Sequence, residues 1–219
     1  MFGCEAGPKR CMQVVPPEQL HGDPGAAKIF QCLTNPYVPP DSKDSVDKRT
    51  WKSNGDPVKP VEFEQTTLNF KHYREHYWKT LLEGVDETKI PEIPVCNLEI
   101  FPYASERKSD ISFKNLLELT TTAYVAAVLA KRILADNSSN NKPWFVFRSW
   151  GTWRWVINWY FPRFGLWGFK DIPEEWERHF LVFSSQNGHI SADNLTYAIK
   201  IRAKDWDEID SIFAPYRKS

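Results

Sequence analysis

The sequence lacks the patterns that would name a reaction. It contains no G-x-G-x-x-G, no G-x-x-x-x-G-K-[ST] and no G-x-S-x-G, so it has neither a familiar nucleotide-binding loop nor the usual serine nucleophile. Its 28 basic and 28 acidic side chains cancel, which argues against a general attraction to nucleic acid or to an anionic membrane. We therefore expect a chain without catalytic activity and without a cofactor.

Cysteine is scarce, and the amino end has no targeting pattern. The four cysteines are irregularly spaced and do not indicate a disulfide framework. A single disulfide bond, formed in an oxidising compartment, is the alternative. The first residues lack the apolar run of a secretory signal, and Glu5 argues against a cleavable organelle presequence. We expect any organelle address to be internal. The cysteines are Cys4, Cys11, Cys32 and Cys96.

Tryptophan, by contrast, is abundant and concentrated. Six of the ten tryptophans fall between Pro143 and Lys170, where arginines alternate with the rings. Indole rings and arginine side chains both suit a boundary between an apolar phase and water, so we expect an interface with lipid or with other subunits. A tryptophan-rich core of a soluble domain is the alternative. The interface candidates are Trp144, Trp150, Trp153, Trp155, Trp159, Trp167, Arg148, Arg154 and Arg163.

Residues 1–61 form the first predicted unit. Residues 1–60 hold nine of the sixteen prolines and few apolar side chains, which cannot offset the entropy lost on ordering so long a segment. We expect an extended arm that wraps a partner.

Residues 62–104 form the second unit. Spacings of three, four and seven between apolar residues predict an amphipathic helix from Glu62 to Glu83 that stops at Gly84. Three prolines then predict an extended connector.

The third unit, residues 105–171, contains an apolar helix over residues 111–134. The stretch between Lys114 and Lys131 carries one charge, and at about 1.5 Å per residue it falls short of a bilayer's roughly 30 Å. A buried helix of a soluble body and a short transmembrane or membrane-apposed helix both stay open. The longest uninterrupted aromatic piece, Thr152 to Phe161, predicts a second, short helix.

The fourth unit, residues 172–219, predicts a helix-loop-helix. Pro173 opens a helix over IPEEWERHFLVF, and ADNLTYAIKIRA follows as the second helix. The outline is similar to an EF-hand, but Phe183 would occupy the first ligand position and Asn194 the twelfth, where calcium needs a bidentate acid. We expect no calcium site.

One short motif competes with this non-catalytic interpretation. His72, Glu75 and His76 match the H-x-x-E-H order of inverted zinc peptidases, in which two histidines four apart on a helix bind zinc. The match covers only five residues, and Lys71, Arg74 and Lys79 do not suit a buried catalytic helix. A solvated or partner-facing histidine pair explains the same residues, so we predict no metal.

Together these features predict a mainly α protein: an irregular helical body with a long proline-rich arm. We expect a non-catalytic accessory subunit of a large membrane-associated assembly, of the kind found in mitochondrial respiratory complexes or ATP synthase, at the mitochondrial inner membrane. Its partners would be other subunits and membrane lipid rather than nucleic acid. The alternatives are a soluble zinc-dependent enzyme that uses His72, Glu75 and His76, and a component of a mitoribosome-like ribonucleoprotein.

Overall fold

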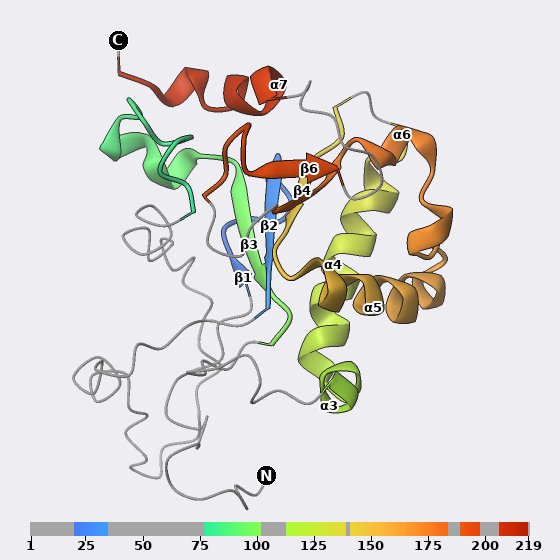
Figure 1. Cartoon of the computed structure of the whole chain (residues 1–219). Helices are drawn as coiled ribbons and strands as arrows, with labels where there is room; N and C mark the ends of the chain where they lie inside the picture. The colour runs from blue at the N-terminus through green and yellow to red at the C-terminus, as the bar shows by residue number, and fades with distance from the viewer. Residues whose placement is uncertain are drawn as a thin grey trace, which may run out of the picture.

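A mixed six-stranded sheet lies at the centre of the protein (Figure 1). The computed structural model describes residues 20–34, 77–101, 113–138, 141–183, 189–197 and 206–218. The order of the strands across the sheet is β1-β3-β2-β4-β5-β6. The strands are β1 (Leu20–His21), β2 (Ile29–Leu33), β3 (Val95–Glu99), β4 (Trp144–Phe147), β5 (Phe180–Phe183) and β6 (Leu195–Tyr197).

The four inner strands are parallel, and the two edge strands are antiparallel to their neighbours. Parallel strands are buried on both faces, which explains why they are short apolar runs such as WFVF and FLVF without alternating polar residues. The turn after β1 requires glycine, because Gly22 has a φ of 96° and a Cβ there would lie 2.2 Å from the carbonyl oxygen of Val95.

Helical segments cover both faces of the sheet. Figure 1 shows α3, α4 and α5 on one side of the strands, and α7 with the segment before β3 on the other. We call these the first face and the second face. The first face carries α3 (Phe113–Glu118), α4 (Thr120–Ala135), α5 (Trp150–Tyr160), the 3-10 helices η5 (Phe161–Phe164) and η6 (Phe169–Asp171), and α6 (Glu174–Glu177). The second face carries residues 77–84, η3 (Glu87–Glu92), α7 (Trp206–Ser211) and η7 (Ala214–Tyr216).

The connections between parallel strands explain this distribution. The described part of the chain between β2 and β3, residues 77–94, lies on the second face, whereas the described helices between β3 and β4 and between β4 and β5 lie on the first. Right-handed crossovers require opposite faces when the strand order changes direction. The direction changes between β2 and β4, so the segments that follow these two neighbouring strands lead to opposite sides of the sheet. This is a topological switch point.

Aromatic side chains fill the core of the first face. Phe145, Phe147 and Phe180 stack within 5.2–6.5 Å of one another, and Trp153 meets Phe147 edge to face at 5.5 Å. The buried Trp153 indole also donates a hydrogen bond of 3.2 Å to the carbonyl oxygen of Leu33 at the end of β2. Each such ring contributes about 1.5–3 kcal/mol through burial.

The prediction of a mainly α protein is wrong, because a mixed sheet organises the described residues. The four parallel strands are runs of four or five residues, and almost all their side chains are buried. Such runs carry no period of two, so periodicity alone cannot distinguish them from pieces of buried helix or connector.

Three strands, β1, β2 and β3, lie in regions predicted to be irregular. β2 falls within the predicted arm of residues 1–61, yet it is an inner strand of the sheet. β3 falls within the predicted connector after Gly84; Pro91 and Pro94 precede the strand and Pro102 follows it, so no proline lies within it. Residues 1–19 and 35–61 of the arm lie outside the described residues, as does the predicted helix up to residue 76. Residues 77–83, the described end of that predicted helix, form turns and not an assigned helix.

The predicted carboxyl-terminal helix-loop-helix is also corrected. Pro173 does precede a helix, but α6 ends at Glu177, and the sequence FLVF that follows is β5. The second predicted helix contains β6 instead, followed by residues outside the described part. Phenylalanine and valine pack well in strands, and the apolar FLVF run is paired with β4.

The apolar helix predicted over residues 111–134 is confirmed as helix from residue 113 onward, in two pieces that break at Leu119. Within the described residues, neither this helix nor any other combines the length and the apolar character needed to cross a bilayer. Its buried residues, among them Val125, Leu129 and Ile133, pack on the first face of the sheet. The short helix predicted from Thr152 to Phe161 is α5.

Candidate functional site

Polar side chains interrupt two of the apolar inner strands, β2 and β3, on the second face. Gln31 is the central residue of β2, and its partner on β3 is Asn97. Glu99 ends β3 opposite Leu33. Side chains two residues apart share a face, and Ile29, Leu33 and Val95 belong to the core of the second face, so Gln31, Asn97 and Glu99 point to that side.

Gln31 and Asn97 are buried without hydrogen bonds to their amide groups. Both residues are 0% exposed, and among the described residues neither the oxygen nor the nitrogen of either amide has a partner. Leaving one buried polar group unsatisfied costs about 1–3 kcal/mol. Native proteins rarely tolerate this, and two amides at paired positions of neighbouring strands need a functional explanation.

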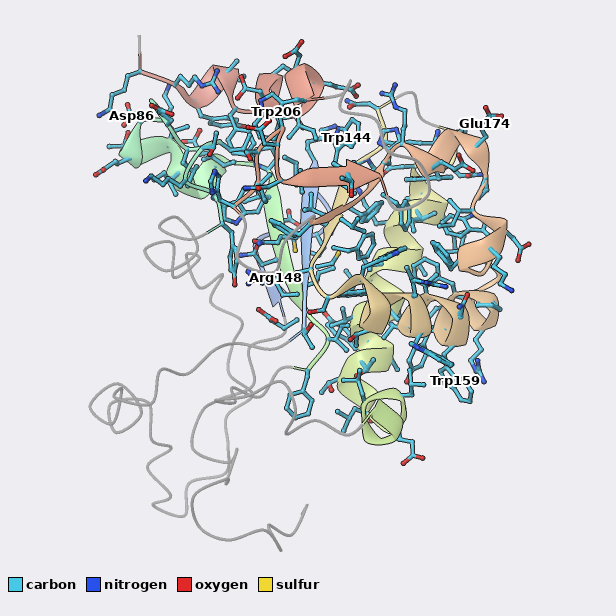
Figure 2. The ribbon with its side chains drawn as sticks, viewed as in Figure 1. Asp86, Trp144, Arg148, Trp159, Glu174 and Trp206 are labelled. Atoms are coloured by element: carbon cyan, nitrogen blue, oxygen red, sulfur yellow. The ribbon has the colours of Figure 1, made fainter. Side chains whose placement is uncertain are left out.

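Arg148 and Tyr77 complete the polar group. Arg148 directly follows β4, and its guanidinium carbon lies 4.6 Å from the centre of the Tyr77 ring. Figure 2 shows Arg148 on the side of the sheet that faces away from α4 and α5. A backbone hydrogen bond fixes residue 77 in place: its carbonyl oxygen accepts from the N–H of Ile190 at 2.8 Å. We call Gln31, Tyr77, Asn97, Glu99 and Arg148 the carboxyl-edge cluster.

The charges of Arg148 and Glu99 both act on the Tyr77 phenol. Burial is the main cause that raises the pKa of Tyr77, the positive charge of Arg148 opposes the rise, and the negative charge of Glu99 adds to it. The phenol therefore stays protonated over the whole physiological range. The cluster thus combines a cation, a carboxylate, a phenol and two primary amides.

Arg148 follows β4 at the topological switch point and Glu99 ends β3, whereas Gln31 and Asn97 lie in the middle of β2 and β3. β2 and β4 are neighbours, and the chain leaves β4 through Ser149, whose φ of 57° and ψ of 50° are left-handed. This conformation is uncommon for a residue other than glycine. It turns the chain directly from β4 into α5, and the hydrogen bond from Trp153 fixes the first turns of α5 against the end of β2. In open α/β sheets, ligands bind at the carboxyl ends of the strands at this point.

The cysteines do not supply a nucleophile to the cluster. Cys32 and Cys96 are free thiols in the core of the first face, on the opposite side of the sheet. Burial is the main cause that raises the pKa of each thiol well above its ordinary value. Neither thiol forms the reactive thiolate at neutral pH. Cys4 and Cys11 lie outside the described residues.

The nine predicted interface residues are divided by the fold. Trp144 and Trp153 are in the cores, at 1% and 0% exposure, whereas Trp155 and Trp159 on α5 are 60% and 46% exposed. Trp150 and Trp167 are half-buried against the first face. The positions of Trp144 and Trp153 therefore fit the alternative interpretation of the aromatic stretch, a tryptophan-rich core.

The three arginines of that set also have different surroundings. Arg148 belongs to the carboxyl-edge cluster. Arg154 stacks on Phe169 with its guanidinium carbon 4.6 Å from the ring centre, and Arg163 stacks on Trp159 at 4.1 Å. Both are exposed on or next to α5. Whether the exposed residues contact a partner stays a prediction.

The proposed zinc motif cannot be placed. His72, Glu75 and His76 lie outside the described residues. Among the residues that the structure does describe, no three histidine, cysteine or acidic side chains are grouped closely enough to hold a metal ion.

Sequence reasoning missed most of the carboxyl-edge cluster. The available signal was one polar residue inside each of two apolar runs, Gln31 in IFQCL and Asn97 in VCNLE. A polar residue in a run that is otherwise buried indicates a buried polar group, but only strand pairing shows that the two are neighbours. The sequence predicts Arg148 as an interface residue because it lies among tryptophans. The structure instead places it against Tyr77 in the carboxyl-edge cluster.

Comparison with known proteins identifies no family. No family model matches the sequence, and neither the curated proteins nor the solved structures yield a significant match. A functional conclusion must therefore come from the residues themselves.

Proposed function

We propose that the chain binds a small, planar, polar ligand in the carboxyl-edge cluster. The observation that carries this proposal is the pair of fully buried, unsatisfied amides of Gln31 and Asn97 at paired positions of β2 and β3. A ligand that supplies their missing hydrogen bonds recovers the free energy that these groups cost in the free protein.

The side chains of the cluster define the chemistry of that ligand. Each primary amide presents a donor and an acceptor side by side, which is complementary to a group with an adjacent acceptor and donor, such as the edge of a nucleobase or of a carboxamide-bearing ring. The two strands are about 4.8 Å apart, so one small ring system can reach both amides. The ring of Tyr77 and the charges of Arg148 and Glu99 offer stacking and orienting contacts.

The position of Glu99 and Arg148, at the carboxyl ends of β3 and β4, supports the same proposal by analogy. Doubly wound sheets of many unrelated functions bind nucleotides and other ligands at the switch point, beside the carboxyl ends of the strands. This analogy supports ligand binding at this edge, but it does not support any particular reaction. Binding is therefore the function proposed, without an assigned chemical step.

Calorimetry and thermal shift with free nucleobases, nucleosides and nicotinamide test the proposal, with cyclohexanecarboxylic acid and benzene derivatives as non-matching probes. The wild type is expected to bind at least one ring that carries an amide-like edge. Gln31→Met and Asn97→Leu keep the volume but remove the amide, and each should weaken binding at least tenfold because a buried ligand group loses its partner. Trp155→Ala, on the exposed side of α5, is the matched control and should bind as the wild type does.

Two results would reject this function. Either no amide-bearing ring binds the wild type more tightly than the non-matching probes, or the two amide-removing variants bind as well as the wild type. Circular dichroism of each variant establishes that a loss of binding does not result from unfolding.

An accessory role in a membrane-associated assembly stays a second proposal. Its support is the exposure of Trp155 and Trp159, which is high for so large an apolar side chain. Fractionation of the native protein in mild detergent, followed by identification of whatever co-migrates, tests it. Migration of the chain alone at its own mass of 25.6 kDa would reject this role.

A further inference from the structure

The surface of α5 that faces away from the sheet combines aromatic rings with positive charge. Trp155 and Trp159 are four residues apart and therefore share one side of the helix. Both are large and exposed, at 60% and 46%. Arg154 and Arg163, also exposed, lie at either end of this pair. Figure 2 shows Trp159 on the side of α5 that faces away from the body of the protein. We call these four residues the α5 outer face.

The rest of α5 is fixed firmly enough to present this surface as a rigid unit. Its opposite side buries Trp153, Val156 and Ile157 in the core of the first face. The Tyr160 hydroxyl donates a hydrogen bond of 2.5 Å to the carbonyl oxygen of Leu117, which joins the end of α5 to α3. The exposed indoles are therefore a feature of a well-anchored helix and not of a loosely attached one.

The arginines are held against aromatic rings with their charge on the surface. The guanidinium of Arg163 lies 4.1 Å above the Trp159 ring and donates to the carbonyl oxygen of Trp159, while Arg154 stacks on Phe169. From Trp150 to Phe169 the sequence contains two basic residues, Arg154 and Arg163, and no acidic one, and both arginines are exposed. Although the chain has no net charge, this surface is locally positive, so its partner should be anionic.

We propose that the α5 outer face binds the surface of an anionic lipid bilayer. Tryptophan is favoured at the level of lipid headgroups, where its ring is half in an apolar phase and its N–H remains in the wet layer. Arginine beside it pairs with headgroup phosphates and gains from the negative surface potential. The chain would lie on the membrane through this helix, a mode that requires no membrane-spanning segment.

The shape and the stacking favour a bilayer over a nucleic acid. Proteins that bind single-stranded nucleic acid combine stacking rings with a positively charged groove that follows the backbone. The α5 outer face is the convex side of a helix, and Arg163 covers one face of the Trp159 ring. A second copy of this chain is also disfavoured, because two identical basic surfaces would repel each other.

Co-sedimentation with vesicles tests the proposal directly. Vesicles of phosphatidylcholine alone are compared with vesicles that also contain about 30% phosphatidylserine, at low and at high salt. The wild type should bind the anionic vesicles more tightly, and salt should weaken this binding. The double variant Trp155→Ala with Trp159→Ala, and separately Arg154→Gln with Arg163→Gln, should each lower the partition coefficient by about tenfold or more.

Matched controls come from α4, where Tyr124 is 47% exposed and Lys131 is also on the surface. Tyr124→Ala with Lys131→Gln removes one exposed ring and one charge elsewhere, and it should leave vesicle binding within about twofold of the wild type. Brominated lipids provide a second measurement, because they should quench tryptophan fluorescence in the wild type and much less in the variant that lacks both exposed indoles.

Other occupants of this surface would appear as distinct results. Binding of a single-stranded oligonucleotide without binding of anionic vesicles would overturn the proposal in favour of nucleic acid. Loss of a dimer in the tryptophan variant would overturn it in favour of a second copy, and equal binding by the variants and the wild type would overturn it outright. Small-ligand binding in the carboxyl-edge cluster is measured separately, so failure of one proposal leaves the other intact.

Discussion

The two faces of one sheet have different chemistry, although alternate residues of the same strands form them. On the first face, β4 and β5 contribute Phe145, Phe147 and Phe180, and the core there is closed by rings from α5 and α6. On the second face, the corresponding alternate residues of β2 and β3 include Gln31, Asn97 and Glu99. A sheet that needed only stability would have apolar side chains at all these positions. The difference indicates that the first face specifies the fold and that the second face holds polar groups at a cost in stability.

The largest effect should come from the first face. Trp153→Ala removes a fully buried ring, its contact with Phe147 and its hydrogen bond to Leu33. We expect the free energy of unfolding to fall by about 3–5 kcal/mol, measured by urea denaturation followed by circular dichroism.

The exposed Trp155 on the same helix provides the control. Trp155→Ala should change the free energy of unfolding by about 0.5 kcal/mol or less, because the ring is 60% exposed. If the two variants were destabilised equally, the division of the tryptophans between core and surface would be incorrect.

The second effect concerns the thiols of the first face. Burial raises the pKa of Cys32 and of Cys96 well above their ordinary value of 9.0. The folded chain therefore keeps both protons at a pH where the unfolded chain has lost them. Stability is fully present below pH 9 and falls as the pH rises toward the folded values. The expected loss is about 1 kcal/mol per thiol between pH 9 and pH 10.

Measurement of urea midpoints at pH 8, 9 and 10 checks this dependence. A variant with Cys32→Ala and Cys96→Ala is less stable at pH 8 but should lose much less stability on going to pH 10. Tyr77 and Tyr160, whose pKa values burial also raises, are present in both proteins and act at higher pH. An identical pH dependence in the two proteins would show that the thiols ionise while the chain is folded.

The sequence predicts the helices of the first face better than it predicts the strands. The helix over residues 111–134 and the short helix within the aromatic stretch were predictable because apolar residues recur there at helical spacing or fill a segment without glycine or proline. The strands were not, because parallel strands are short and buried on both sides. Without β2 as a strand, the proline-rich region before residue 61 resembles a disordered arm.

The candidate site was harder still to predict. Gln31 and Asn97 are 66 positions apart, and only the pairing of β2 with β3 makes them neighbours. Tyr77 and Arg148, which contact each other on the same face of the sheet, come from two further segments. Each residue alone is an ordinary polar side chain in an apolar context. That these residues form a group depends on the strand order, which local periodicity does not encode.

The smallest effect is also the sharpest test of the comparison between faces. Removing one buried polar group should raise the free energy of unfolding on the second face and lower it on the first. Gln31→Met on the second face removes an amide whose donor and acceptor are both unsatisfied, and it preserves the volume. The free energy of unfolding should rise by about 1 kcal/mol. Thr122 on α4 is equally buried, but its hydroxyl donates a hydrogen bond of 3.2 Å to the carbonyl oxygen of Ile100.

Thr122→Val is therefore the matched change at a satisfied polar group, and it should lower the free energy of unfolding by about 1 kcal/mol. Urea denaturation at pH 7 measures both variants against the wild type. Changes of opposite sign in the free energy of unfolding would mean that the unsatisfied polar groups of the second face lower the stability of the fold. If Gln31→Met were as destabilising as Thr122→Val, the Gln31 amide would be satisfied in solution, and the physical basis for a ligand in the carboxyl-edge cluster would be lost.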